Sequence, residues 1–207
     1  MTASDRVGFE PVTYEPVIFE PVAHPLERFQ RECVSNLMER ALTADCAASA
    51  RQLFEVLESL PDGEIFLQDD PSLRRLLERT IELEAPARTS RFSFRWSSEG
   101  APAEASQATI TLAEALIAQT GSILVTASCG GRGASVVAPC HIVYATTAQL
   151  VPDLAAALGR VSEERMLDRN SFACVISGSS RTADIEKILV QGAHGPRRLV
   201  VILQTGS

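Results

Sequence analysis

The sequence has no excess of basic side chains. Lysine and arginine together number 19 and aspartate and glutamate 26, so the formal net charge is −7. Such a chain offers no broad basic surface for the phosphates of nucleic acids or for anionic lipids. We therefore expect its partner to be a small molecule or another protein, and not a nucleic acid.

Long apolar segments are also missing. No run approaches the roughly 20 apolar residues that a helix needs to cross a bilayer. The first residues show neither the basic nor the apolar region of a secretory signal. These absences predict a cytoplasmic protein without membrane insertion.

Histidine and cysteine are few and are not arranged as metal ligands. The chain has three histidines and five cysteines without a Cys-x-x-Cys pair, the cysteines being Cys33, Cys46, Cys129, Cys140 and Cys174. Zinc sites and iron–sulfur clusters need ligands at short, regular spacings. Several of these cysteines lie within apolar runs, as free thiols do in a reducing compartment. We expect no disulfide, no metal and no cofactor.

The composition that remains is that of one globular domain, which we assign to residues 25–207. Hydrophobic residues make up 45% and charged residues 22% of the chain, as in ordinary soluble domains. The helical first part, residues 25–83, has apolar residues at helical spacing and predicts helices over 26–38, 47–60 and 73–83, with a short strand at 65–67. Asp45 can cap the second helix, and Asp70-Pro71 opens the third.

Residues 91–207 form the sheet core of this domain. Residues 91–96 predict a strand with one wet face, and short apolar runs typical of buried strands occupy 123–126, 140–145, 172–176 and 199–203. Helices are expected between them, over 111–121, within 147–159 from Pro152, and around Ile185, Ile188 and Leu189. This alternation predicts an α/β fold of three layers, a largely parallel sheet with helices on both faces, whose ligands bind outside the carboxyl ends of the strands.

Thr111 and Glu114 have the spacing of a capping box. The expected helix over 111–121 would then begin with two side chains that satisfy free backbone donors. Capping accounts for Glu114 without a catalytic role.

Residues 1–24 form an extended arm with a small repeat. Phe9, Tyr14 and Phe19 each begin an aromatic-Glu-Pro-Val unit, and a proline in every unit prevents continuous helix. The arm is either a plain tail or a segment whose aromatic side chains dock on this chain or on a partner. Self-binding of this kind would make the protein a homo-oligomer.

Two polar loops are the candidate ligand site. One is rich in glycine and the other in hydroxyl groups, and their candidate residues are Gly130, Gly131, Arg132 and Ser135, then Ser179, Ser180, Arg181, Thr182, Asp184 and His194. Arginine suits bidentate contacts with carboxylate or phosphate, so Arg132 and Arg181 together would form an anion pocket. The alternative is that Arg181 pairs with Asp184 or Glu186 inside its own loop.

No catalytic residue can be assigned from these patterns. Cys129 precedes two glycines but has no recognisable base beside it. His141 lies inside a predicted buried strand, and His194 in His-Gly-Pro is of a kind that often fixes a loop. Both histidines remain open as acid–base groups.

The C-terminal half resembles the lactate-utilization (LUD) domain family. The resemblance rests on Ile110-Thr-Leu-Ala-Glu-Ala-Leu-Ile-Ala-Gln-Thr-Gly121, on Arg132 with Ser135, Pro139 and His141-Ile142, on Val151-Pro152, and on Ser180-Arg-Thr-Ala-Asp-Ile-Glu186 with Gly192-Ala-His-Gly-Pro196. It implies a fold similar to ribose-5-phosphate isomerase, glucosamine-6-phosphate deaminase and the coenzyme A transferases. It also implies a role in oxidising L-lactate beside iron–sulfur partner subunits. A sister branch carries ferredoxin-like cysteine runs that this sequence lacks, so the resemblance is to the cluster-free subunit.

Two amides depart from the family pattern. Gln107 and Gln119, the latter beside Thr120, stand where the family has acids. An amide can still hydrogen-bond a ligand but cannot accept its proton as a base. All three residues are further candidates for ligand contact.

Two functions follow from these observations. The first is a subunit of a lactate-oxidising assembly that binds an organic anion or partner subunits through the polar loops. The second, based on the resemblance in fold, is an autonomous enzyme that acts on a small phosphorylated or coenzyme A-linked anion. We expect ligand binding with little independent catalysis.

Overall fold

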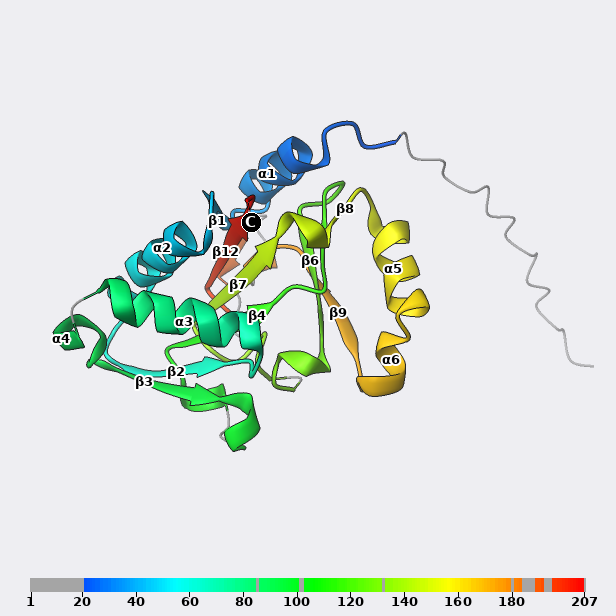
Figure 1. The fold of residues 1–207 in the computed structure, drawn as a ribbon. Coiled ribbons are helices and arrows are strands. Elements are labelled where there is room, and N and C mark those ends of the chain that lie inside the picture. The colour runs from blue at the N-terminus through cyan, green and yellow to red at the C-terminus, as the bar shows by residue number, and fades with distance from the viewer. Residues whose placement is uncertain are drawn as a thin grey trace, which may run out of the picture.

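A six-stranded parallel sheet organises the chain (Figure 1). The computed structural model describes residues 21–84, 86–100, 103–131, 133–179, 181–183, 189–191 and 195–206, and only the backbone of 86, 87, 181–183 and 189–191. The helices and strands in chain order are α1 (Pro25–Ser35), β1 (Glu39–Thr43), α2 (Cys46–Glu58), β2 (Gly63–Leu67), α3 (Pro71–Leu83), α4 (Pro86–Thr89), β3 (Phe92–Trp96), β4 (Ala108–Leu112), β5 (Ala115–Ile117), β6 (Ser122–Thr126), β7 (Cys140–Thr146), β8 (Leu150–Val151), α5 (Leu154–Glu163), α6 (Met166–Arg169), β9 (Ala173–Ile176), β10 (Arg181–Ala183), β11 (Leu189–Gln191) and β12 (Arg198–Gln204).

The first three helices confirm the sequence prediction. Asp45 caps α2 by accepting a hydrogen bond from the Ala48 N–H at 2.8 Å, and Asp70 caps α3 by accepting one from the Ser72 N–H at 2.7 Å. Both carboxylates satisfy donors that a helix start leaves free. Among the described helices, none combines the length and the apolar character that crossing a membrane requires.

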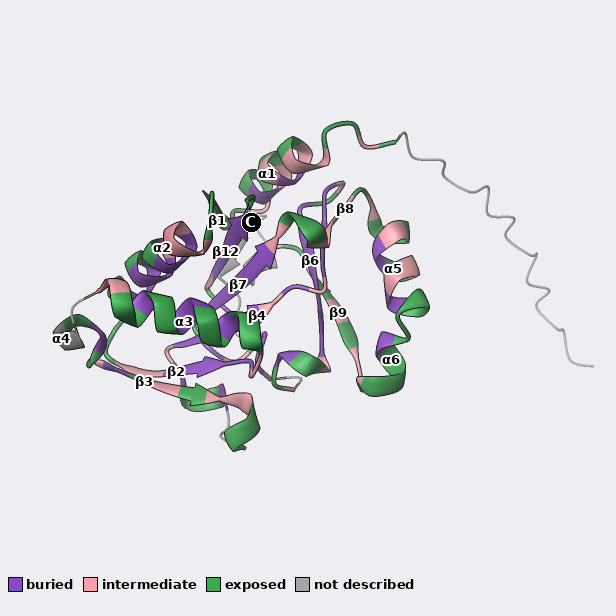
Figure 2. Cartoon of the chain, viewed as in Figure 1, coloured by how far each residue is buried: buried purple, intermediate pink, exposed green. Residues whose placement is uncertain are grey.

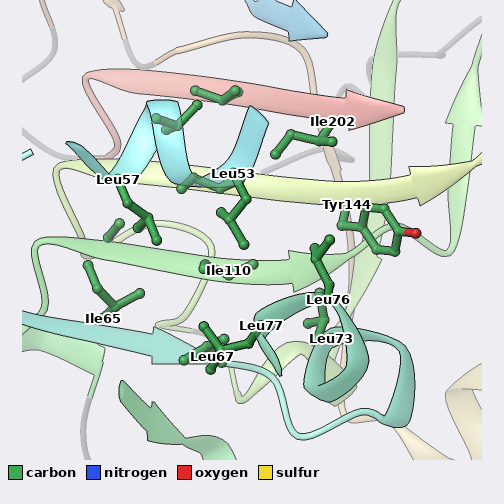
Figure 3. Close-up of a cluster of buried hydrophobic side chains, with 14 of the residues drawn as sticks. Leu53, Leu57, Ile65, Leu67, Leu73, Leu76, Leu77, Ile110, Tyr144 and Ile202 are labelled. Atoms are coloured by element: carbon green, nitrogen blue, oxygen red, sulfur yellow. The ribbon is translucent and has the colours of Figure 1, made fainter. Parts of the chain in front are cut away.

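The large sheet has the strand order β1-β12-β7-β4-β2-β3, and every pair is parallel. Helices α2 and α3 cover one face and α1 lies on the other, which confirms the predicted three-layer α/β fold (Figure 1). Figure 3 shows the core between α2, α3 and the sheet, where the labelled residues are Leu53, Leu57, Ile65, Leu67, Leu73, Leu76, Leu77, Ile110, Tyr144 and Ile202.

A second, four-stranded sheet shares the face that α1 covers. Its order is β8-β5-β6-β9, with β6 antiparallel to both β5 and β9. Leu116 and Ile123 pack towards Val143 and Val201 of the large sheet, while Ala157 and Met166 of α5 and α6 cover the outer side. Strands β7 and β12 are therefore buried on both faces (Figure 2).

The helix predicted over 111–121 is wrong. Residues 108–112 form β4 and residues 115–117 form β5, because nearly every residue from 108 to 118 is buried and a helix with one wet face cannot satisfy that pattern. The Thr111 hydroxyl hydrogen-bonds His141 and does not cap a helix. Gly121, at φ 61°, serves the turn between β5 and β6 and not a helix end.

The helix predicted between the last two strands is also wrong at its ends. Arg181–Ala183 and Leu189–Gln191 pair as antiparallel strands β10 and β11, and residues 184–188 lie outside the described chain. Strand β9 is half exposed although a buried strand was predicted there. Strand β1 was not predicted, because its charged residues hide the apolar pattern.

The turn at Gly121 gives a test of how the small sheet joins α1. A Cβ atom at Gly121 would lie 2.7 Å from the Glu32 carbonyl carbon, whereas at Gly100, also in the left-handed region at φ 69°, it would meet nothing within 4 Å. Gly100→Ala should lower the free energy of unfolding only by the backbone strain of about 1 kcal/mol. Gly121→Ala should lower it clearly more, because its Cβ atom would also clash with α1. Urea unfolding of both variants measures the difference, and equal losses would contradict this packing.

Candidate functional site

A cleft opens at the carboxyl ends of the central strands. Strands β4 and β7 are neighbours, and Glu114 lies two residues beyond the end of β4. The cleft has a volume of about 640 Å³ and is lined by Glu114, Ala127, Ser128, Glu164, Met166, Arg169, Asn170 and Ser171. We call it the Glu114 cleft. It occupies the edge at which parallel α/β sheets bind ligands.

The loop after β6 holds the Glu114 carboxylate. The Thr126 hydroxyl donates to its Oε1 atom at 2.7 Å, and the Ser128 hydroxyl donates to the same atom at 3.0 Å. Among the ion pairs of the described residues, none involves Glu114. The side chain that was assigned to a helix cap is thus a fixed carboxylate in a cleft.

Two arginines approach the same cleft in different states. Arg160 lines a smaller adjoining pocket of about 220 Å³, pairs with Glu164 at 3.1 Å and donates to the Glu114 backbone oxygen at 3.4 Å. Arg169 donates to the Glu164 backbone oxygen at 3.2 Å, and within the described part of the chain no carboxylate pairs with its guanidinium. The cleft therefore contains one unpaired negative and one unpaired positive side chain.

The predicted glycine loop closes beside the cleft. Gly130 has φ 109° and a Cβ there would lie 2.6 Å from the Phe66 ring, so only glycine lets the loop pack on the sheet. Gly131 has φ 96°, and its N–H donates to the Ala127 oxygen at 2.9 Å. Ser135 is buried, and Arg132 lies outside the described residues. Burial raises the pKa of Cys129 to about 11, so this thiol stays protonated at neutral pH and is a poor nucleophile.

The second predicted loop begins at the other end of β6. Ser177 hydrogen-bonds Ser122, the first residue of β6, at 2.6 Å, whereas the glycine loop follows the last residue of that strand. Ser179 follows Ser177 by two residues and therefore belongs to this loop. Only backbone is described for Arg181 and Thr182, and Ser180, Asp184 and His194 lie outside the described residues. The joint anion pocket of Arg132 and Arg181 stays a prediction.

His141 is enclosed in the sheet. It is fully buried, and its Nε2 atom lies 2.8 Å from the Thr111 hydroxyl. Its Nδ1 atom and the hydroxyl of its strand neighbour Thr109 have no hydrogen-bond partner among the described residues. Burial lowers the pKa of His141 to about 4, which keeps the ring neutral at pH 7. The buried ring does not line the Glu114 cleft.

The two amides occupy different places. Gln107 precedes β4 at the amino ends of the parallel strands, where its side chain approaches Gly63. Gln119 lies in the turn between β5 and β6, with its backbone bonded to Pro152 and Arg28. Thr120 is exposed beside it. None of the three residues lines the Glu114 cleft.

The sequence reasoning missed most of the cleft. Arg169, Asn170 and Ser171 lie between the helix predicted within 147–159 and the strand predicted at 172–176, and Glu114 lies in a predicted helix that does not exist. The continuous apolar character of residues 108–118 was the available indication that a strand ends just before Glu114. Among the described residues, no group of three His, Cys, Asp or Glu side chains could hold a metal ion.

The pH dependence of stability tests the burial of His141. The unfolded chain takes up a proton at this ring near pH 6.5 and the folded protein only near pH 4, so stability is complete above 6.5 and falls between these values. The loss should approach about 3 kcal/mol at about 1.4 kcal/mol per pH unit. Unfolding free energies of the wild type and of His141→Gln measure it, because the variant lacks this component. If the unfolding free energies of the wild type and the variant change in parallel with pH, His141 is not buried as described.

Comparison with known proteins finds relatives that share one name. Lactate utilization protein C of Macrococcus caseolyticus is 30% identical over 160 residues, which cover 73% of this chain and 65% of that protein. The protein of that name in Bacillus subtilis is 29% identical over 126 residues, or 52% of each chain. The chain thus spans between about half and two thirds of the length of these relatives.

A solved structure shares the fold. The crystal structure of a DUF162 family protein from Deinococcus radiodurans superimposes with a TM-score of 0.65 and 19% identity, covering 90% of this chain and 100% of that chain. The sequence profile of the LUD domain matches residues 98–204, a segment that includes every residue of the Glu114 cleft. This match covers more than half of the 207 residues of the chain, and the chain therefore belongs to the LUD domain family.

Proposed function

We propose that the protein takes part in lactate utilization in the cytoplasm, as a subunit that binds a small organic anion and acts with iron–sulfur partner proteins. The names of its relatives support the process. The observation that carries the binding role is the Arg169 guanidinium, which lines the cleft and has no carboxylate partner within the described chain. An arginine in this state suits a ligand carboxylate.

The chemistry of the cleft explains why the proposal includes partners. Oxidation of lactate to pyruvate removes two electrons and two protons. Carboxylate, hydroxyl, amide and guanidinium groups can bind and orient an acid and can hold a proton, but the side chains that line this cleft do not accept electrons. The proposal therefore assigns electron transfer to the partner proteins.

One observation favours the second candidate, an autonomous enzyme for a coenzyme A-linked anion. The Glu114 carboxylate lies in the cleft, so the acid that Gln119 fails to supply is available elsewhere. A carboxylate that attacks a thioester forms an acyl anhydride and releases the thiolate. Mass spectrometry after incubation with acetyl-coenzyme A, with Glu114→Gln as control, detects this intermediate or its absence.

Growth on lactate tests the subunit role. Deletion of the gene in the source organism should abolish growth on L-lactate and leave growth on glucose unchanged. Wild-type protein and Arg165→Ala should restore growth, since Arg165 is exposed and pairs with Asp168 at 2.7 Å outside the cleft. Arg169→Ala should fail to restore it, because it removes the cation that binds the ligand.

Affinity capture tests the partners. Tagged protein from lactate-grown cells should bring down proteins with iron–sulfur absorbance, in equal amounts for the Arg165→Ala and wild-type forms. Undiminished growth of the deletion strain on lactate would refute the proposed function, whatever the capture recovers.

A further inference from the structure

We propose that the Glu114 cleft selects small carboxylic acids that carry a hydrogen-bond donor on C2, with Glu114 accepting from that donor and Arg169 binding the carboxylate. This inference rests on the proposed function and adds to it a ligand class and a specificity-determining residue. Both side chains line one cleft, and no ion pair joins them to each other. A ligand with two chemically different ends can satisfy both.

The position of Glu114 is set before any ligand binds. Its Oε1 atom accepts hydrogen bonds from Thr126 and Ser128, which lie two residues apart at the end of β6. Both donors are uncharged hydroxyl groups, so they orient the carboxylate without pairing it with a cation. The structure thus presents an acceptor that is already oriented in the cleft, as a selective site requires.

The sign of this group decides which acids fit. A carboxylate ligand near Glu114 is repelled unless it brings a proton for a hydrogen bond, because two acceptors that face each other leave both oxygens unsatisfied. A 2-hydroxy acid donates its hydroxyl proton, and a 2-amino acid donates from its ammonium group. A 2-oxo acid offers only a further acceptor, and an unsubstituted acid offers nothing at C2. The cleft therefore distinguishes the reduced from the oxidised member of a hydroxy acid and oxo acid pair.

The second charged pair in the cleft supports the same assignment. Glu164 is engaged by Arg160 at 3.1 Å, so its charge is matched within the protein. Arg169 contacts the backbone oxygen of Glu164 and no side-chain carboxylate within the described residues. Only Arg169 and Glu114 are thus left with charge for a ligand among the four charged residues of the cleft and its adjoining pocket.

Calorimetric titration of the full chain tests the assignment, with L-lactate, L-alanine, pyruvate and propionate as the four probes. Lactate, alanine or both should bind at least about tenfold more tightly than pyruvate and propionate, the factor expected for one lost charged hydrogen bond. Glu114→Gln should bring the affinities for lactate and pyruvate together, because the amide can donate to pyruvate as well as accept from lactate. Arg169→Ala should weaken all binding about tenfold or more.

Two further variants keep the test decisive. Glu163→Gln changes an exposed acid on α5 that does not line the cleft, and it should bind like the wild type. Ser128→Ala removes one of the two donors to Glu114 without changing charge, and it should reduce the preference for the C2 donor even if Glu114→Gln fails to fold.

The outcomes separate this inference from the proposed function. Binding of alanine without lactate would support the site and contradict lactate as its ligand. Equal binding of pyruvate and lactate by the wild-type protein, or binding of none of the four acids at millimolar concentration, would overturn the role of Glu114. The growth phenotype on lactate would then decide the proposed function independently.

Discussion

The structure depends on the pairing of β12, the last strand of the chain, between β1 and β7. Strand β1 is an edge strand whose sheet partner is β12, with Glu39 opposite Val200 and Thr43 opposite Gln204. Arg198 also forms a bidentate ion pair with Glu39, with N–O distances of 2.6 and 2.7 Å. The Gln204 side chain accepts from Tyr144 at 2.6 Å and so ties β12 to β7. Strand β1 is therefore held in the sheet by residues 198–204, and the helix that follows it, α2, is held against the sheet by the same pairing.

The segments that follow β4 and β7 determine where the cleft lies. Strands β4 and β7 are adjacent in the sheet, but the chain between them leaves to build β5, β6 and the glycine loop. After β7 it leaves again to build β8, α5, α6 and β9. Both segments leave the large sheet at its carboxyl edge, and they pair with each other in the small sheet through β5 with β8 and β6 with β9. The Glu114 cleft lies where the first segment faces the second, so residues far apart in sequence line one site.

Helices α1 to α3 and strands β7 and β12 could be predicted because their local patterns agree with their environment. Amphipathic spacing and two aspartate caps define the helices, and continuous apolar runs define β7 and β12. The prediction failed where local and tertiary preferences disagree. Thr111 and Glu114 have capping-box spacing, but the segment is buried on both faces, and burial outweighs the roughly 1 kcal/mol of a cap. The Glu114 site was missed for the same reason, because Glu114 acquires its surroundings from the end of β6, the loop after it and the segment around α6.

Gln107 and Gln119, the two amides that depart from the family pattern expected from the resemblance, have less weight than the sequence alone suggested. Gln107 is at the amino ends of the strands and Gln119 is in a turn packed by Arg28, so neither amide faces the cleft at the carboxyl edge. Of the two acids that line that cleft, Glu164 is paired with Arg160, and Glu114 has no ion-pair partner among the described residues. A change of charge at the two glutamines therefore does not remove the proton acceptor from the candidate site.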